Sequence, residues 1–438
     1  MAKTRRIEVS ALSRVEGEGA IRVTVKGKTV QHVELNIYEP PRFFESFLRG
    51  RAIHEVPDIT SRICGICPVA YQMSSCHALE KALKLAIPPE LRTLRRLLYC
   101  GEWIESHALH VYMLHAPDFL GYESGISMAA DRRADVERGL RMKKIGNELL
   151  GILGGRAIHP INVTVGGFYR APSRRDLKAL LPDLEWGLNA AIETLHFVSN
   201  FDFPAFEQSY EFVALKHADE YPMNDGRVVS SEGLDIPVDE YEQHFSERHR
   251  PQSTALHSVR LPRETHYLCG PLARLNLCRE QLPPIARREA DACGTAWPSF
   301  NSFKSIVARA VEMIAAFETA IEIIKDYNAE PAQSRVEFTP RAGQGCQATE
   351  APRGLLYHRY RIGDDGLIAE AKIVPPTSQN QGQIEDDLRS FVPSILDCDD
   401  AEATRRCEHL IRNYDPCISC ATHFLRLTIE RHASVDGR

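Results

Sequence analysis

The chain has 438 residues, of which 43% are hydrophobic and 26% are charged, as in ordinary globular proteins. Its formal net charge of -6 comes without a long block of like charge, which argues against nucleic acid or an anionic membrane surface as the main partner. Neither a signal peptide nor a run of about 18 apolar residues can be recognised, so we expect a cytoplasmic protein without a membrane span.

The N-terminal half begins with strand patterns and continues with helical ones. The stretch AIRVTVKGKTVQHVELNIYE alternates apolar and polar residues, which predicts two strands that turn at Gly27-Lys28. From about Pro88, apolar residues recur every three or four positions, and this spacing predicts helices. We expect these helices in residues 88–118, 134–155 and 173–201.

The C-terminal half predicts short strands, long helices and one hairpin. Residues 210–262 are polar and irregular, which favours short strands. Helices are predicted for residues 285–297, 301–327, 384–396 and 401–414, and a hairpin for residues 354–376 that turns at Gly363-Asp364-Asp365-Gly366. No repeat or low-complexity linker divides the chain. The pattern predicts one α+β unit, mainly helical, with peripheral antiparallel β-ribbons.

Two Cys-x-x-Cys pairs lie near opposite ends of the chain. Cys64 and Cys67 belong to RICGIC, and Cys417 and Cys420 belong to DPCISC. Two intervening residues let both sulfurs of a pair face one metal, and four thiolates suit zinc, nickel or iron. Structural zinc sites usually have their two pairs much closer in sequence. The spacing alone leaves open separate thiol sites, a structural zinc site, or a deep catalytic metal centre.

Six motifs in a fixed order resolve this choice through a family resemblance. They are SRVEGEG, PRFFE, RICGIC, GGRAIHPINVTVGGF, TEAPRGLLYH and DPCISCATH. Across nearly its whole length, the chain resembles the large subunit of nickel-iron hydrogenases. ESHALHVYMLHAPDFLGY, TEAPRG and DPCISC make it similar to the cytosolic group 3 enzymes, which work with NAD(P) and are sometimes called sulfhydrogenases. The resemblance implies the large-subunit fold with a central helical bundle, and reversible heterolytic cleavage of dihydrogen.

The resemblance also implies the cofactor and its ligands. Nickel would be bound by all four cysteines, with Cys64 and Cys417 as terminal ligands. Cys67 and Cys420 would bridge to an iron that carries carbonyl and cyanide.

Other residues match positions around the centre. Pro376 and Thr377, in VPPT, match the pocket for the diatomic ligands of the iron. Glu45, in RFFE, and His423 match ligands of a second cation, for which hard oxygen ligands favour magnesium, with iron as the alternative.

Catalytic roles follow from the same resemblance. Arg353, in EAPRG, corresponds to an arginine above the open metal position, where it acts as a base or an electrostatic partner. Asp118 and Asp415 match carboxylates that hold this guanidinium. Glu16, in RVEG, matches the glutamate that accepts a proton from a cysteine thiol. One departure is Tyr71, which stands where the family often has histidine.

The chain lacks motifs that would carry electrons onward. It has no Gly-x-Gly-x-x-Gly after a strand, no P-loop and no further cysteine cluster for an iron-sulfur centre. The resemblance implies a small iron-sulfur partner subunit and flavin subunits that reach NAD(P). The alternative within the family is a hydrogen-sensing regulatory subunit. The cysteine pairs disfavour a related quinone-site subunit of respiratory complex I, and elemental analysis would identify a zinc scaffold.

The C-terminal residues have an expected role in maturation. Residues 1–423 would form a single catalytic domain, and residues 424–438 a propeptide. In the family, a maturation endopeptidase cuts after the histidine that matches His423, once nickel-insertion chaperones have loaded the metal.

Overall fold

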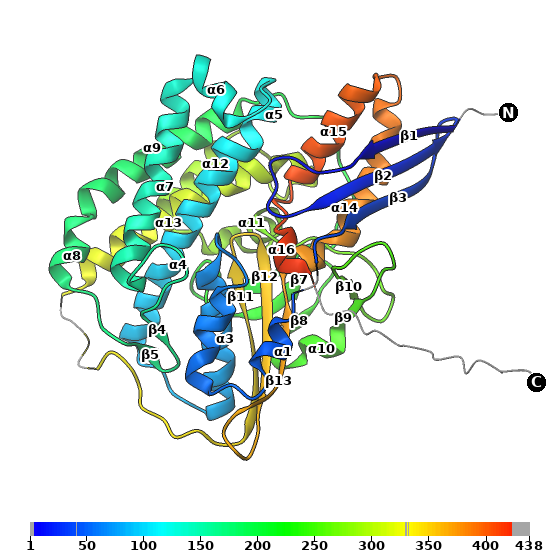
Figure 1. The fold of residues 1–438 in the computed structure, drawn as a ribbon. Helices are drawn as coiled ribbons and strands as arrows, with labels where there is room; N and C mark the ends of the chain where they lie inside the picture. Colours follow the sequence, from blue (N-terminus) through cyan, green and yellow to red (C-terminus); the bar gives the residue numbers. More distant parts are fainter. Residues whose placement is uncertain (1–3, 41, 329–330, 332, 423–438) are drawn as a thin grey trace, which may run out of the picture.

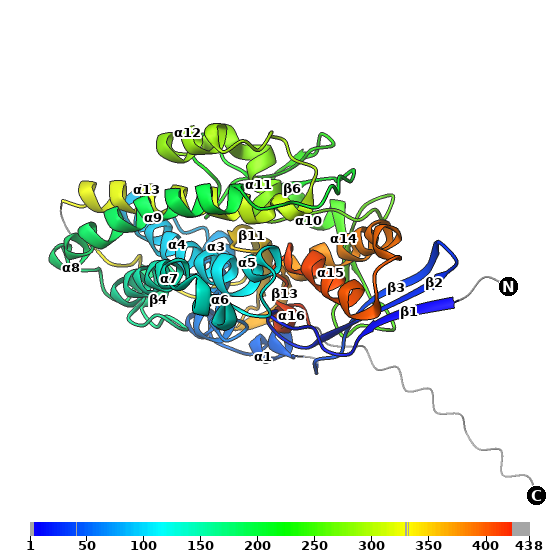
Figure 2. The same cartoon turned by 90° about the horizontal axis from the view of Figure 1, so that it is seen from above.

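The computed structural model describes residues 4–40, 42–328, 331 and 333–422. Four long helices pack side by side and form the helical part of the molecule (Figures 1 and 2). They are α4 (Pro89–Leu109), α7 (Arg133–Gly154), α9 (Leu181–Ser199) and α13 (Ser305–Asp326). The helices expected in these regions and the central bundle are confirmed.

Sequence signals mark the limits of these helices. Pro89 opens α4, where its missing N–H costs no hydrogen bond. Helix α7 ends at Gly154, and Gly155 follows with φ of 81°, a left-handed conformation that favours glycine. Helix α13 is apolar around most of its circumference, and it therefore runs through the core.

Shorter helices connect and cover the bundle. They are α1 (Phe44–Leu48), α2 (Val56–Ser61), α3 (Pro68–Leu83), α5 (Ala116–Leu120), α6 (Gly125–Asp131), α8 (Arg174–Ala179), α10 (Tyr241–His244), α11 (Pro271–Cys278), α12 (Pro284–Ala292), α14 (Pro376–Phe391), α15 (Asp400–Arg412) and α16 (Ile418–Ala421). A π-helical turn, His110–His115, joins α4 to α5. Helix α14 begins eight residues before the expected start at residue 384. Within the described residues, no helix has the length and apolarity needed to cross a bilayer.

The strands form small antiparallel sheets. The three-stranded sheets are β1 (Thr4–Val9), β2 (Gly19–Lys26) and β3 (Thr29–Ile37); β6 (Val213–Lys216), β7 (Arg227–Ser230) and β8 (Asp235–Ile236); and β11 (Gly343–Ala351), β12 (Gly354–Ile362) and β13 (Ile368–Val374). The two-stranded sheets are β4 (Val163–Thr164) with β5 (Gly167–Phe168), and β9 (Phe245–Arg248) with β10 (His257–Arg260). The predicted turns at residues 27–28 and 363–366 are confirmed.

Strand β11 packs directly on α3, the helix that follows the first cysteine pair. A Cβ on Gly343 would lie 2.5 Å from the carbonyl oxygen of Ala82, and one on Gly345 would lie 2.3 Å from that of Ala78. Only glycine permits this approach of strand to helix. The sheet β11–β13 therefore holds α3, and with it the loop that carries Cys64 and Cys67.

The two ends of the chain meet beside this sheet. The N–H of Ile418 in α16 donates to the carbonyl of Glu16 at 2.9 Å. Strand β1 also lies against α15 (Figures 1 and 2). All four motif cysteines belong to the largest apolar cluster of the protein. The cysteines thus sit in the main core, as expected for a deep site.

Candidate metal centre

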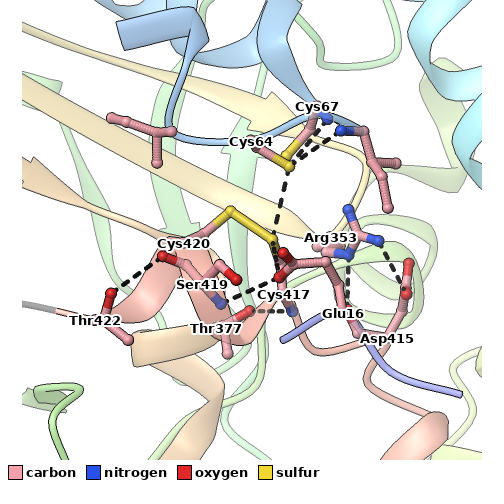
Figure 3. Close-up of a disulfide and its surroundings, with 12 residues drawn as sticks. Glu16, Cys64, Cys67, Arg353, Thr377, Asp415, Cys417, Ser419, Cys420 and Thr422 are labelled. Atoms are coloured by element: carbon pink, nitrogen blue, oxygen red, sulfur yellow. Dashed lines mark hydrogen bonds and ion pairs between the residues drawn. A yellow bond between two sulfur atoms is a disulfide. The ribbon is translucent and has the colours of Figure 1, made fainter. Parts of the chain in front are cut away.

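The two cysteine pairs converge at one point. Cys64, Cys67, Cys417 and Cys420 are all buried, and their Sγ atoms lie within 4.8 Å of one another. Cys64 Sγ is 3.6 Å from Cys417 Sγ. In this structure Cys417 and Cys420 form a disulfide (Figure 3). A metal would bind these sulfurs in the thiolate form.

The loop before α3 stabilises one thiolate. The amides of Ile66 and Cys67 donate to Cys64 Sγ at 3.3 and 3.2 Å. Burial raises the pKa of Cys64, but the hydrogen bond from the Cys67 thiol and the charge of Arg353 outweigh it, so the pKa falls below its ordinary value. The hydrogen bond to Cys64, followed by burial, raises the pKa of Cys67. Within the first pair, Cys64 therefore loses its proton more readily than Cys67.

The second pair is positioned by the start of α14. The hydroxyl of Thr377 accepts the amide N–H of Cys417 at 2.9 Å. Pro376 is buried at the first position of the same helix, and its carbonyl accepts the thiol of Cys269 at 3.7 Å. Thr377 thus lies at the cysteine site, whereas the contact of Pro376 is with Cys269, outside the four motif cysteines.

Glu16 reaches the same cluster from the N-terminal segment. Its Oε2 lies 3.1 Å from Cys417 Sγ and accepts the amide of Ser419 at 3.1 Å. The side chain is half-buried. Once the disulfide is reduced, a thiol on Cys417 can pass a proton to this carboxylate.

Arg353 and Asp415 form a buried ion pair beside the cysteines (Figure 3). The Nε of Arg353 donates to the carbonyl of Asp415 at 2.8 Å, and Nη2 donates to Oδ1 at 3.2 Å. Burial lowers the pKa of Arg353, but the charges of Asp415, Cys67 and Cys64 raise it above the ordinary value. The arginine is therefore a permanent buried cation.

Asp118 has different partners from those expected. Its carboxylate accepts Arg412 Nε at 2.7 Å and Nη2 at 3.0 Å, and Arg14 Nη2 at 2.5 Å. Arg412 lies one turn before Asp415, and Arg14 lies two residues before Glu16. Asp118 therefore contacts the chain next to both of these site residues. The prediction that Asp118 holds Arg353 is corrected: Asp118 fixes the two segments that carry Asp415 and Glu16.

Tyr71 is fully enclosed next to the first cysteine pair. Its hydroxyl has no hydrogen-bond partner among the described residues. Burial, followed by the charges of Cys67 and Cys64, raises the pKa of this phenol well above its ordinary value. The tyrosine is therefore neutral and retains a free hydroxyl donor.

Glu45 lines a cavity of about 30 Å³ next to Cys420 and Thr422. Its Oε1 accepts the amide of Ile373 at 2.8 Å. The predicted partner His423 lies outside the described residues, but Thr422 brings the chain to the cavity wall.

A buried network of charged side chains fixes the backbone next to Arg353. Arg274 donates to Glu312 Oε1 at 2.7 Å and to Glu350 Oε2 at 2.9 Å. It also donates to the carbonyls of Ala351 and Pro352, both at 2.9 Å, immediately before Arg353. Sequence reasoning missed this network, although Glu350 belongs to the motif that contains Arg353.

The charge of Arg274 controls the ionisation of its partner in α13. Burial raises the pKa of Glu312, but Arg274 lowers it to about 2. Glu312 therefore stays ionised at neutral pH, and the carboxylate keeps its ion pair.

These residues fit a metal centre with four sulfur ligands. Four buried sulfurs supply soft donors. The nearby cation Arg353 stabilises negative charge on them, and its buried Nη1 has no hydrogen-bond partner within the described part of the chain. A buried unsatisfied donor is costly unless a ligand accepts from it.

Known proteins are similar to this chain in sequence and in fold. A family model described as nickel-dependent hydrogenase matches residues 42–139 and 289–423. The alpha subunits of sulfhydrogenases 1 and 2 from Pyrococcus furiosus are 31% and 32% identical to this chain, covering 96% of it and 98% and 100% of their own length. A crystal structure of NAD+-reducing [NiFe]-hydrogenase in the H2-reduced state has a TM-score of 0.86 at 26% identity, covering 97% of this chain and 100% of that one.

Proposed function

Given that the chain belongs to the nickel-dependent hydrogenase family, we propose that its four buried cysteines bind a nickel-iron centre that cleaves dihydrogen reversibly. The chain is the large subunit of a nickel-iron hydrogenase. The observation that carries the proposed site is the convergence of four buried thiols beside Arg353 and Glu16.

In the proposed centre, the cysteines divide the two metals between them. Cys64 and Cys417 would hold the nickel, and Cys67 and Cys420 would hold both the nickel and an iron with carbonyl and cyanide ligands. The hydroxyl of Thr377 lies at the edge of the cluster, where it accepts the amide N–H of Cys417. A hydroxyl there can donate to a small anionic ligand.

The chain contributes proton transfer and electrostatics to the reaction. When bound, the metals supply Lewis-acid polarisation and a template for heterolytic cleavage. Glu16 takes the released proton from the thiol of Cys417, which lies 3.1 Å away. Arg353 presents a fixed positive charge and a free Nη1 donor toward negative charge that develops in the transition state. Asp415 holds that guanidinium in place.

Electrons must leave the chain through partner subunits. Among the described residues, the sole group of cysteines suited to metal binding is the four-cysteine site itself. We infer a small iron-sulfur subunit next to this chain, followed by flavin subunits that reach NAD(P). The similarity to sulfhydrogenase alpha subunits and to an NAD+-reducing hydrogenase supports this path.

A second cation and C-terminal processing complete the proposal. Glu45 and His423 bind magnesium or iron at the cavity next to Thr422. A maturation endopeptidase removes residues 424–438 after nickel-insertion chaperones have acted. The mass of the chain in active enzyme tests this cut, since a chain that retains Arg438 contradicts it.

Hydrogen turnover by the purified complex tests the function. We expect hydrogen-dependent reduction of a viologen dye and of NAD+ or NADP+. Glu16→Gln should keep nickel and iron but lower turnover by about 100-fold or more, because the amide cannot accept the proton. A metal-loaded Glu16→Gln complex with undiminished turnover would remove this role. Hydrogen binding without reduction of any acceptor would favour the regulatory alternative.

A further inference from the structure

A second carboxylate lies just beyond Glu16 on the way to the surface. Glu39, which follows β3, is half-buried and has an exposed residue on either side. Its Oε2 accepts the hydroxyl of Ser419 at 2.8 Å. The amide of the same serine donates to Glu16 Oε2 at 3.1 Å. Ser419 therefore connects the two carboxylates, one through its backbone and the other through its side chain.

Gly17 makes this close arrangement possible. Its φ is 87°, and a Cβ at this position would lie 2.7 Å from Glu39 Oε2 and 2.8 Å from the amide nitrogen of Ser419. Any other residue would push both groups away from Glu16, in addition to straining the backbone. The second glutamate is thus packed against the segment that carries the first.

The backbone of Glu39 is also fixed from the opposite side. The hydroxyl of Thr254 donates to the carbonyl of Glu39 at 2.8 Å and to that of Ile37 at 3.1 Å. The amide of Glu18 donates to Glu39 Oε2 at 3.3 Å. These contacts hold the Glu39 carboxylate in a defined place between the core and the solvent.

We propose that Glu39 is the next proton acceptor after Glu16, with the hydroxyl of Ser419 as the carrier between them. This role rests on the proposed function. In this structure Glu16 Oε2 bonds to the Ser419 amide, so the protonated Glu16 carboxyl group first turns from that amide to the neighbouring Ser419 hydroxyl. Its O–H bond then breaks as the Ser419 oxygen accepts the proton, and the original hydroxyl proton of Ser419 passes to Glu39. One proton moves, no electron is transferred, and rotation of the serine hydroxyl restores the starting state. Glu39 then releases the proton to solvent.

Isotope exchange in the complete complex tests this route. Glu39→Gln removes the acceptor, and Glu18→Gln is the matched control because it changes an exposed side chain and keeps the backbone donor to Glu39. In Glu39→Gln we expect both turnover and exchange of D2 with H2O to fall about tenfold or more. Nickel and iron content and para-to-ortho hydrogen conversion, which needs no proton release to solvent, should stay at wild-type levels. Glu39→Asp should recover part of the exchange.

Three outcomes would overturn the route. The first is wild-type exchange in metal-loaded Glu39→Gln. The second is parallel loss of exchange and para-to-ortho conversion, which would place the damage at the metals. The third is full exchange in Ser419→Ala, which keeps the amide donor to Glu16 and lacks the hydroxyl. A wild-type complex without any hydrogen turnover would instead contradict the proposed function itself.

Discussion

At the scale of single residues, the site depends on buried charges whose partners are fixed. Arg353 is 2% exposed, and burial alone would make its charge costly. Asp415 offsets that cost with two hydrogen bonds from the guanidinium, one to its backbone and one to its carboxylate. The Nη1 of Arg353 has no hydrogen-bond partner among the described residues, so it can donate to a group bound at the metal centre. A planar guanidinium can meet these demands together, whereas a lysine ammonium is a point charge without this fork.

Arg353→Lys should therefore damage catalysis more than assembly. We expect nickel and iron to be retained, and dye-linked hydrogen turnover to fall by about 100-fold, as for loss of other preorganised electrostatic donors. The control is Arg361→Lys in β12, the strand that follows Arg353; its side chain is 44% exposed and pairs with Glu370. Equal turnover in the two metal-loaded variants would contradict the role of Arg353.

The residues near the cysteines were predictable where they lie in contiguous motifs. Glu16, Thr377 and Arg353 each belong to a short motif that resembles one in the hydrogenase family, and this resemblance predicted their place near the cysteines. The partner of Asp118 was not predictable, because its choice among nearby arginines depends on how α15 packs against α5. Glu39 was also missed, since its approach depends on the contact with Gly17.

At the scale of elements, Arg274 on α11 joins α13 to β11. It pairs with Glu312 and Glu350, and all three side chains are fully buried. The network fixes the backbone just before Arg353 through the carbonyls of Ala351 and Pro352. The packing of α11, α13 and β11 thus determines the position of the Arg353 backbone.

Arg274→Met should destabilise the protein strongly. It leaves two carboxylates buried without their cation, a change that costs about 3–5 kcal/mol. Thermal unfolding, followed by circular dichroism, should show a lower midpoint. Arg279→Met removes an exposed pair with Asp291 and should cost about 0–1 kcal/mol. Similar midpoints for the two variants would show that the network contributes little.

Periodicity predicted the long helices and the hairpins, but it missed several elements. Helix α3 is buried on nearly all sides and includes polar residues, so its sequence shows little contrast between faces. Strand β11 consists mainly of small and polar residues, with glycines where it contacts α3. These elements form because of tertiary packing, which local patterns do not report.

At the scale of the whole molecule, the metal site forms only when both ends of the chain have docked. Arg5 in β1 pairs with Asp400 at the start of α15 at 2.8 Å. Arg412 at the end of α15 donates to the carbonyl of Ser13 at 2.7 Å. These contacts bring the N-terminal segment with Glu16 against the C-terminal cysteines. Metal loading and closure of the fold are therefore coupled, as for other metals held by distant ligands.

The metal content of the purified complex, read together with its infrared spectrum, tests the nickel-iron assignment most directly. The four-cysteine site predicts nickel and iron in about equal amounts per chain, accompanied by carbonyl and cyanide stretching bands. Cys64→Ser, which replaces one of the four sulfur ligands, should lose nickel. Zinc without nickel, or nickel and iron without these bands, would contradict the assignment.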